Sequence, residues 1–251
     1  MGIVNITPDS FSDGGNYFTA ETAVQHGLEL LADGADILDL GAQSTRPAYT
    51  EVSPEEEWAR LSPVLTALRE RTDAPLSVDT YFPFVAEKAL AAGADIINDV
   101  SGTVSEEMAE IVSTYGAGWV IMHSGAGGAK EVRAFFNETA EKIKRLGLDE
   151  AQICLDMGIG FGKSYEQNLE LLARVKDYKH PAFPLLLGVS RKRVIGRASG
   201  QEEPKNRVYG NIAADTAALL GGADLFRLHD IKNEKQGILT AWAIKDLGNR
   251  I

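Results

Sequence analysis

Eight short apolar runs in the chain each end in a polar side chain of a type that can bind or polarise a substrate. These side chains are Asn5, Asp39, Asp79, Asn98 with Asp99, His123, Asp156, Ser190, and Arg227 with His229. Carboxylates can accept a ligand's N–H groups and stabilise positive charge, whereas arginine and histidine can hold a leaving anion. An aspartate or asparagine at a strand end can also cap a helix or close a turn. Eight such ends together favour one polar pocket, because an unpaired carboxylate in an apolar layer is costly.

Positive charge is scarce, since 25 Lys and Arg stand against 36 Asp and Glu, giving a formal net charge of −11. This balance argues against a nucleic-acid or anionic-membrane surface. Five cations nevertheless fall in or beside the loops that follow the apolar runs: Arg46, Lys163, Lys192, Arg193 and Arg227. Each alone could be solvated surface charge. Their concentration in these loops predicts an anionic ligand, such as a phosphorylated one.

A glycine-rich segment, Gly158 to Ser164, invites comparison with nucleotide-binding loops. A Walker loop would need glycine where Met157 stands, and a dinucleotide fingerprint starting at Gly158 would need glycine or alanine at Lys163. Both motifs fail. We interpret the segment as a compact loop that brings backbone close to a flat ligand, with Asp156 before it and Phe161 able to pack on a ring.

The residues that usually provide nucleophiles or metal ligands are few. Cys154 is the one cysteine and lies in an apolar run, so it is interpreted as a small buried hydrophobe in a reducing cytosol. The four histidines, His26, His123, His180 and His229, show no paired spacing, so a metal site made by protein alone is not predicted. Magnesium held mainly by ligand phosphates stays open.

Apolar runs rich in Val, Ile and Leu alternate with amphipathic segments along the whole chain, and these elements must position the polar ends. We predict strands at 2–7, 35–41, 76–80, 95–101, 118–123, 153–158, 184–190 and 223–229. We predict helices near 20–33, 54–71, 83–93, 105–115, 131–146, 166–177, 206–221 and 234–247.

One connector recurs with nearly the same letters before three of these strands: Gly34-Ala-Asp36, Gly93-Ala-Asp95 and Gly222-Ala-Asp224. Glycine in a left-handed helix cap allows the chain to turn directly into the next strand. Strand–helix alternation builds either an open doubly wound sheet or a closed barrel. Eight units within 251 residues, without a linker or composition break, favour a single-domain (β/α)8 barrel spanning 1–251. The loops that follow the strands of this barrel would carry the active site.

Targeting features are missing from the sequence pattern. No stretch approaches the roughly 18–20 apolar residues of a membrane span, and the start lacks the basic and apolar regions of a signal peptide. We therefore expect a cytoplasmic protein. Because Met1 to Pro8 reads like the middle of a strand, we also expect further residues ahead of Met1 in the native chain.

The assembled motifs resemble those of the dihydropteroate synthase family. The matching segments, in family order, are Met1–Gly15, Ser44–Pro47, Ser77–Thr80, Asp95–Gly102, Met122-His123, Asp156–Lys163, Gly188–Lys192 and Arg227-x-His229. The resemblance implies a magnesium-assisted reaction of 6-hydroxymethyl-7,8-dihydropterin pyrophosphate with 4-aminobenzoate, which gives dihydropteroate and pyrophosphate. It also implies a homodimer.

The same resemblance implies a role for each matching residue. The pterin would contact Asp79, Asn98, Met122, Asp156, Phe161, Gly188 and Lys192. Asn5, Arg227 and His229 would hold the pyrophosphate, with Asn5 near Mg²⁺, and Thr45, Arg46, Pro47 and Ser190 would receive the aminobenzoate. Asp9 and Phe11 would close over the reacting centre, and the catalytic set would be Asp9, Asp79, Lys192 and Arg227.

Three residues depart from the family pattern. Gln43 stands where Glu is usual, Met157 replaces Pro, and Ser124 stands where Met is common. These departures keep open a paralogue that binds pterin without turning it over. A pterin-dependent methyltransferase domain is disfavoured, because it has no need for the cations of Ser190-Arg-Lys192 and Arg227-x-His229.

Overall fold

The computed structural model describes residues 1–6, 16–43 and 52–250. By their contacts the residues divide into two compact units, Met1–Val100 with Ser105–Val120, and Ser101–Val104 with Ile121–Ile251. The prediction of one domain spanning 1–251 stays a prediction. In the part of the chain that is described, no helix is long and apolar enough to cross a membrane.

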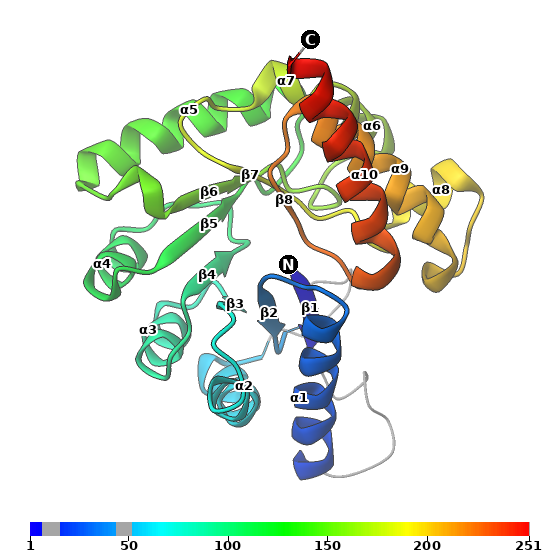
Figure 1. Cartoon of the computed structure of the whole chain (residues 1–251). Coiled ribbons are helices and arrows are strands. Elements are labelled where there is room, and N and C mark those ends of the chain that lie inside the picture. The colour runs from blue at the N-terminus through cyan, green and yellow to red at the C-terminus, as the bar shows by residue number, and fades with distance from the viewer. Residues whose placement is uncertain (7–15, 44–51, 251) are drawn as a thin grey trace. The chain divides into compact units, whose positions relative to one another are not determined.

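The first unit repeats a strand followed by a helix. Its elements are β1 (Gly2–Asn5), α1 (Asn16–Ala32), β2 (Leu38–Gly41), α2 (Pro54–Arg69), β3 (Leu76–Asp79), α3 (Pro83–Ala91), β4 (Ile96–Asp99) and α4 (Glu106–Tyr115). The strands pair in parallel, with Gly2 opposite Leu38, Leu38 opposite Leu76, and Ser77 opposite Ile96. Figure 1 shows α2, α3 and α4 along the outer side of β2, β3 and β4.

The second unit continues the same alternation. After β5 (Gly118–Met122), which straddles the two units, come α5 (Ala129–Leu146), η2 (Glu150–Gln152), β6 (Ile153–Asp156), α6 (Tyr165–Ala173), α7 (Val175–Tyr178), β7 (Leu185–Leu187), α8 (Arg193–Ser199), η3 (Pro204–Arg207), α9 (Val208–Gly221), β8 (Leu225–Phe226) and α10 (Ile231–Arg250). Leu155 pairs with Leu185, and Leu186 pairs with Leu225, again in parallel.

The strands follow one another in the order β1 to β8 within one eight-stranded sheet, so the predicted (β/α)8 fold class is confirmed. All eight predicted strands are present but shorter at their ends. The helix predicted at 166–177 is interrupted at Arg174, which caps α6 and precedes α7. The helix α8 was not predicted, because its seven residues are too few to show a periodic pattern.

Local signals explain where the helices begin. Ser53, Ser105 and Ser164 each accept a backbone N–H from three residues on, so they cap α2, α4 and α6. The strands are held by burial, since Val4, Leu40 and Val78 have no exposed surface. Capping sets the helix starts, and burial sets which strand face turns inward.

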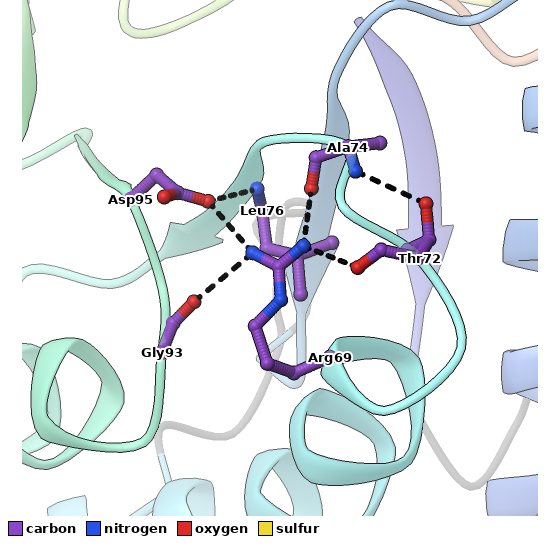
Figure 2. A network of polar contacts seen from close by, with 6 residues as sticks. All are labelled: Arg69, Thr72, Ala74, Leu76, Gly93 and Asp95. Atoms are coloured by element: carbon purple, nitrogen blue, oxygen red, sulfur yellow. Dashed lines mark hydrogen bonds and ion pairs between the residues drawn. The ribbon is translucent and has the colours of Figure 1, made fainter.

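The Gly-Ala-Asp connectors behave as the sequence predicts. Gly34, Gly93 and Gly222 have φ angles of 101°, 100° and 113°, in the left-handed region that favours glycine. The aspartate of the second connector does more than end a turn. Its Oδ2 accepts the backbone N–H of Leu76 at 2.8 Å and the Arg69 guanidinium at 3.1 Å (Figure 2). Arg69 also donates to the carbonyls of Thr72, Ala74 and Gly93.

The third connector repeats this arrangement in the second unit. Asp224 Oδ2 accepts the N–H of Leu185 at 2.9 Å and the Lys179 ammonium at 2.7 Å. Lys179 also donates to the carbonyl of Gly222, as Arg69 does to that of Gly93. We call each aspartate–cation pair with its backbone contacts a clip. Each clip therefore joins the start of one strand to the residues that lead into the next strand. The repeated letters reflect a repeated way of joining neighbouring strands.

Replacing Asp95 by alanine should lower the free energy of unfolding by about 1–2 kcal/mol, because Leu76 N–H and Arg69 lose an ionised acceptor that is partly screened by solvent. Urea unfolding measures the change. Asp73→Ala, an exposed aspartate in the same connection, is the control and should stay within about 0.5 kcal/mol of wild type. Equal effects of the two substitutions would show that the clip contributes nothing.

Candidate active site

A buried carboxylate organises the strand ends of the first unit. Asp39 of β2 has no exposed surface, and it accepts the hydroxyl of Ser77 and, at 3.1 Å, the amide Nδ2 of Asn98. The Asn98 Oδ1 is buried and has no hydrogen-bond partner in the described structure. Buried acceptors are normally satisfied, so this oxygen is available to a ligand N–H group. Asp39, which the family resemblance did not assign, orients the predicted pterin ligand Asn98.

Two other predicted residues of this unit lie at strand ends. Asp79 ends β3, is half-buried, and stands opposite Asn98 of β4 in the register. Asn5 ends β1 with its side chain exposed, opposite Gly41 of β2. A Cβ on Gly41 would lie 3.6 Å from the Cβ of Asp79, so the glycine leaves room over this carboxylate. The structure thus gathers Asp79 and Asn98 on neighbouring strands.

The aminobenzoate residues Thr45, Arg46 and Pro47, and the predicted closing residues Asp9 and Phe11, lie outside the described residues. Gln43, just ahead of that segment, donates its Nε2 to the Tyr81 hydroxyl at 2.7 Å. An amide can make this contact as a donor, which an ionised glutamate cannot. The departure from the family pattern at Gln43 therefore has a local partner in this chain.

Asp156 is the centre of the second unit's polar group. It ends β6, is 7% exposed, and its Oδ1 accepts the Gly158 N–H at 2.7 Å. Burial raises the pKa of Asp156, while the nearby charge of Lys192 and the Gly158 N–H act to lower it, followed by Lys163 and Arg227. A ligand that offers N–H donors would favour the ionised form, so this carboxyl is suited to bind such an edge.

Lys192 joins this group from the loop after β7. Its Nζ lies 4.8 Å from the centre of the Phe161 ring and donates to the carbonyl of Ile159. A Cβ on Gly188 would be 3.8 Å from both Lys192 Nζ and Arg227 Cβ, which places β7 and the residues after β8 side by side. The structure therefore brings Asp156, Phe161, Gly188, Lys192 and Arg227 together, as predicted.

Lys163 is one of the cations whose positions in the sequence predict an anionic ligand, but in the structure it contacts backbone carbonyls. Its Nζ donates to the carbonyls of His123 at 3.1 Å, Gly158 at 2.9 Å and Phe161 at 3.3 Å. Burial lowers the pKa of Lys163 to about 8, and the charge of Asp156 opposes this. An ammonium has three N–H bonds, so these three backbone carbonyls can occupy all of its donors. Lys163 braces the glycine-rich loop and does not direct its charge at an anionic ligand.

The glycine-rich loop depends on close backbone approach. Gly158, Gly160 and Gly162 have φ angles of 67°, 84° and 68°. A Cβ on Gly158 would lie 1.9 Å from the carbonyl oxygen of His123, and one on Gly162 would lie 2.8 Å from the Cα of Gly125. Asn168 of α6 accepts the Gly160 N–H at 2.7 Å. The loop is therefore compact, as the sequence indicates, because backbone packs on backbone.

Of the remaining predicted residues near β5 and β6, Met122 and His123 are buried and Cys154 is partly exposed. Met122 ends β5 and has no exposed surface. Burial, with the charge of Lys163, lowers the pKa of His123 to about 4, so its ring is neutral at pH 7. Burial raises the pKa of the Cys154 thiol, so a reactive thiolate is not available there. The raised pKa agrees with the interpretation of Cys154 as an unreactive hydrophobe, although its side chain is not fully buried.

The sequence does not predict that Ser190 and His229 form a cluster with three buried residues of α9 and α10. We define the Glu234 cluster as Ser190, Asn211, Asp215, His229 and Glu234. Ser190 Oγ lies 3.3 Å from both carboxylate oxygens of Glu234, and 3.1 Å from the backbone N and from Nδ1 of His229. Asn211 donates to Glu234 and accepts the backbone N–H of Arg191 at 3.3 Å.

The Glu234 cluster also holds a strained turn. Arg191, between Ser190 and Lys192, has a φ of 62°, which is uncommon for a residue other than glycine. Its N–H is held by Asn211 and its carbonyl accepts the buried Arg207 at 2.6 Å. A sequence signal for the cluster does exist, since Asn211 and Asp215 lie four residues apart on the buried face of α9.

Comparisons with known proteins find one family and several similar chains. The family described as "Pterin binding enzyme" matches residues 1–229. A curated dihydropteroate synthase of Synechocystis sp. is 41% identical over 245 residues, which cover 92% of this chain and 85% of that protein.

Two solved structures are also similar over most of their length. A Xanthomonas albilineans dihydropteroate synthase with 4-aminobenzoic acid is 42% identical, with a TM-score of 0.92 over 98% of this chain and 92% of that one. The same enzyme in complex with 7,8-dihydropteroate is 41% identical, with a TM-score of 0.89 at the same coverage.

Replacing Gly158 by alanine should prevent the glycine-rich loop from adopting its compact conformation, because the added Cβ would overlap the His123 carbonyl oxygen. Gly116→Ala is the matched control, since Gly116 has a similar φ of 62° but nothing within 4 Å of its Cβ position. The control should cost about 1 kcal/mol of backbone strain. Thermal unfolding should show a larger loss for Gly158→Ala, and fluorescence titration with 6-hydroxymethylpterin should show lost binding. Equal Tm shifts would contradict the close-approach argument.

Proposed function

The chain belongs to the pterin-binding enzyme family, and on that premise we propose that it is a dihydropteroate synthase. As such it transfers the pterin-methyl group of 6-hydroxymethyl-7,8-dihydropterin pyrophosphate to 4-aminobenzoate and releases pyrophosphate. The observation that carries the proposal is the grouping of the buried Asp156 with Lys192 and Arg227 at the ends of β6, β7 and β8. A carboxylate next to two cations suits a ligand with an N–H edge at one end and negative charge at the other.

Pterin recognition would begin at Asp156. Its carboxylate would accept the hydrogens of the ring's amino group and N3, which supply the donors that favour its ionised form despite burial. The unpartnered Asn98 Oδ1 would accept a further ring N–H. Lys192, Phe161, Met122 and Gly188 would bound the ring, with the Lys192 ammonium over one face of Phe161. These contacts orient the methylene carbon for displacement.

Bond cleavage would separate a cation from an anion. When the carbon–oxygen bond to pyrophosphate breaks, its electron pair leaves with the oxygen, and the pterin-methyl cation is delocalised into the ring. Asp79 would stabilise that positive charge, while Arg227 and His229 would hold the departing pyrophosphate. The amine nitrogen then bonds to the methylene carbon and loses a proton. The protein needs no covalent nucleophile, which agrees with the inert Cys154.

Magnesium would be held mainly by the substrate. The described residues contain no group of three or more His, Cys, Asp or Glu side chains arranged to hold a metal. The exposed amide of Asn5 at the end of β1 can supply one oxygen, and this fits an ion that keeps several waters and binds phosphates. When bound, Mg²⁺ would neutralise part of the diphosphate charge.

The aminobenzoate amine would have to reach the same methylene carbon. The family resemblance assigns Ser190, Thr45, Arg46 and Pro47 to the aminobenzoate, and Asp9 and Phe11 to the reacting centre. We place this reaction in the cytoplasm, in keeping with a chain that has one unreactive cysteine.

A homodimer is supported by exposed apolar side chains on the last two helices. Tyr209 of α9 is 86% exposed, and Trp242, Ile244 and Leu247 of α10 are 56%, 65% and 62% exposed. Apolar side chains that gather into one surface patch mark interaction sites, and α9 and α10 pack against each other. Sedimentation equilibrium should give twice the mass of one chain, and a monomer at micromolar concentration would rule this proposal out.

The chain should release pyrophosphate only when the pterin pyrophosphate, 4-aminobenzoate and Mg²⁺ are all present. A coupled pyrophosphate assay with each component left out in turn measures this requirement. Pterin binding without pyrophosphate release would instead identify a silent pterin-binding paralogue. Transfer of a methyl group to a corrinoid would identify a methyltransferase.

Lys192→Ala and Asp156→Asn should each lower kcat/KM more than tenfold. Each substitution removes a charge-assisted hydrogen bond, a loss of roughly 1.5–3 kcal/mol. Steady-state kinetics measure the change, and Lys144→Ala, an exposed lysine of α5, is the control that should match wild type. Wild-type rates in both variants would overturn the assignment of the pterin site.

A further inference from the structure

The Glu234 cluster links a deeply buried carboxyl to two residues of the proposed site. We propose that Glu234 is a positioning residue for the diphosphate: it orients the Ser190 hydroxyl so that His229 keeps its Nδ1 proton and presents Nε2 to the anion. This inference rests on the proposed function, which gives His229 its ligand. Glu234 itself would touch neither substrate, since it has no exposed surface.

The direction of the hydrogen bonds follows from counting donors. Ser190 has one hydroxyl proton and lies 3.3 Å from both oxygens of Glu234, which as a carboxylate can only accept. Once that proton points at Glu234, the Ser190 oxygen can only accept from its other neighbours. These are the backbone N–H and the Nδ1 of His229, each at 3.1 Å. Nδ1 of His229 must then carry a proton.

Of the two carboxyl groups in the Glu234 cluster, Glu234 carries the negative charge more readily than Asp215. Asp215 has no exposed surface, and neither of its carboxyl oxygens has a hydrogen-bond partner, so burial and then the neighbouring Glu234 raise its pKa and favour its protonated form. Glu234 instead receives the Asn211 amide and the Ser190 hydroxyl. Burial raises the pKa of Glu234 to about 7, and these two donors oppose the rise.

The consequence for His229 is electrostatic as well as geometric. A negative charge at the far end of the Glu234–Ser190–His229 chain favours a ring protonated on both nitrogens, because Nδ1–H has an acceptor that is itself polarised. A doubly protonated ring offers the diphosphate an N–H donor and a positive charge. Asn211 links the same carboxyl to Arg191, next to Lys192, so one buried group orders both His229 and the turn that precedes Lys192.

The test compares Glu234→Gln, Ser190→Ala and the double variant at pH 8, above the pKa of Glu234. The probe is inorganic pyrophosphate with Mg²⁺, measured by calorimetry, and 6-hydroxymethylpterin is titrated in parallel. Each single variant should raise the pyrophosphate Kd about tenfold, and the double variant should be no worse than Ser190→Ala, because the residues act in one chain. Pterin affinity should stay within twofold.

A second readout follows the His229 ring directly. In ¹⁵N spectra of the imidazole groups, with the signal assigned by His229→Asn, the wild type should show a protonated Nδ1. In Glu234→Gln the amide introduces a donor beside Ser190, so Nδ1 should shift toward the unprotonated form. Glu57→Gln is the matched control, since Glu57 is a buried glutamate of α2 that hydrogen-bonds Thr80. It should change neither the pyrophosphate Kd nor the His229 signals.

The outcomes separate this inference from the proposed function. Additive effects of the two variants, parallel losses of pterin and pyrophosphate binding, or unchanged His229 signals in Glu234→Gln would each overturn the positioning role. Pyrophosphate release by the wild type is measured in the same preparations. If the wild type releases pyrophosphate and Glu234→Gln keeps the wild-type pyrophosphate Kd and His229 signals, only this inference is contradicted. If the wild type releases no pyrophosphate but Glu234→Gln changes the His229 signals, only the proposed reaction is contradicted.

Discussion

A buried carboxylate must be given hydrogen-bond donors, and much of the described structure is arranged to provide them. Asp39 receives Ser77 and Asn98, Asp156 receives the Gly158 N–H, and Glu234 receives Asn211 and Ser190. These donors come from other strands (Ser77 and Asn98), from loops (Gly158 and Ser190) and from helix α9 (Asn211). The cost of leaving such a charge unpaired therefore determines where these elements lie.

The two ends of the strands use aspartate differently. Where a helix runs into a strand, Asp95 and Asp224 accept the N–H of Leu76 and Leu185 and pair with a partly exposed cation, which joins neighbouring strands. Where a strand runs into a loop, Asp156 stays buried among cations, with its pKa raised. Satisfied, half-exposed pairs serve stability, whereas incompletely satisfied groups such as Asn98 leave capacity for a ligand.

Loop rigidity connects these groups to function. Lys163 holds three carbonyls of the glycine-rich loop and its surroundings, and Asn168 holds Gly160, so Phe161 is carried on a braced backbone. On the other side, Asn211 and Arg207 hold both backbone polar groups of the left-handed Arg191. Lys192 follows directly. The cost of ordering these loops is met during folding, and so it does not fall on ligand binding.

The sequence by itself determined the order of strands and helices, the left-handed connectors and the polar residues at the strand ends. These features depend on local periodicity, on glycine's freedom at positive φ and on the position of a residue in its own strand. The sequence did not reveal the break at Arg174 or the short helix α8, because neither leaves a periodic trace.

Only the tertiary structure decided how individual charges are used. Lys163 and Lys192 look alike in sequence, yet Lys163 donates to three backbone carbonyls, whereas Lys192 donates to one and lies beside Phe161 and Asp156. Glu234 and Asn211 come from helices α10 and α9, and they act on Ser190 only because packing brings distant segments into contact. Hydrogen-bond partners far apart in sequence are set by packing, and no local pattern encodes them.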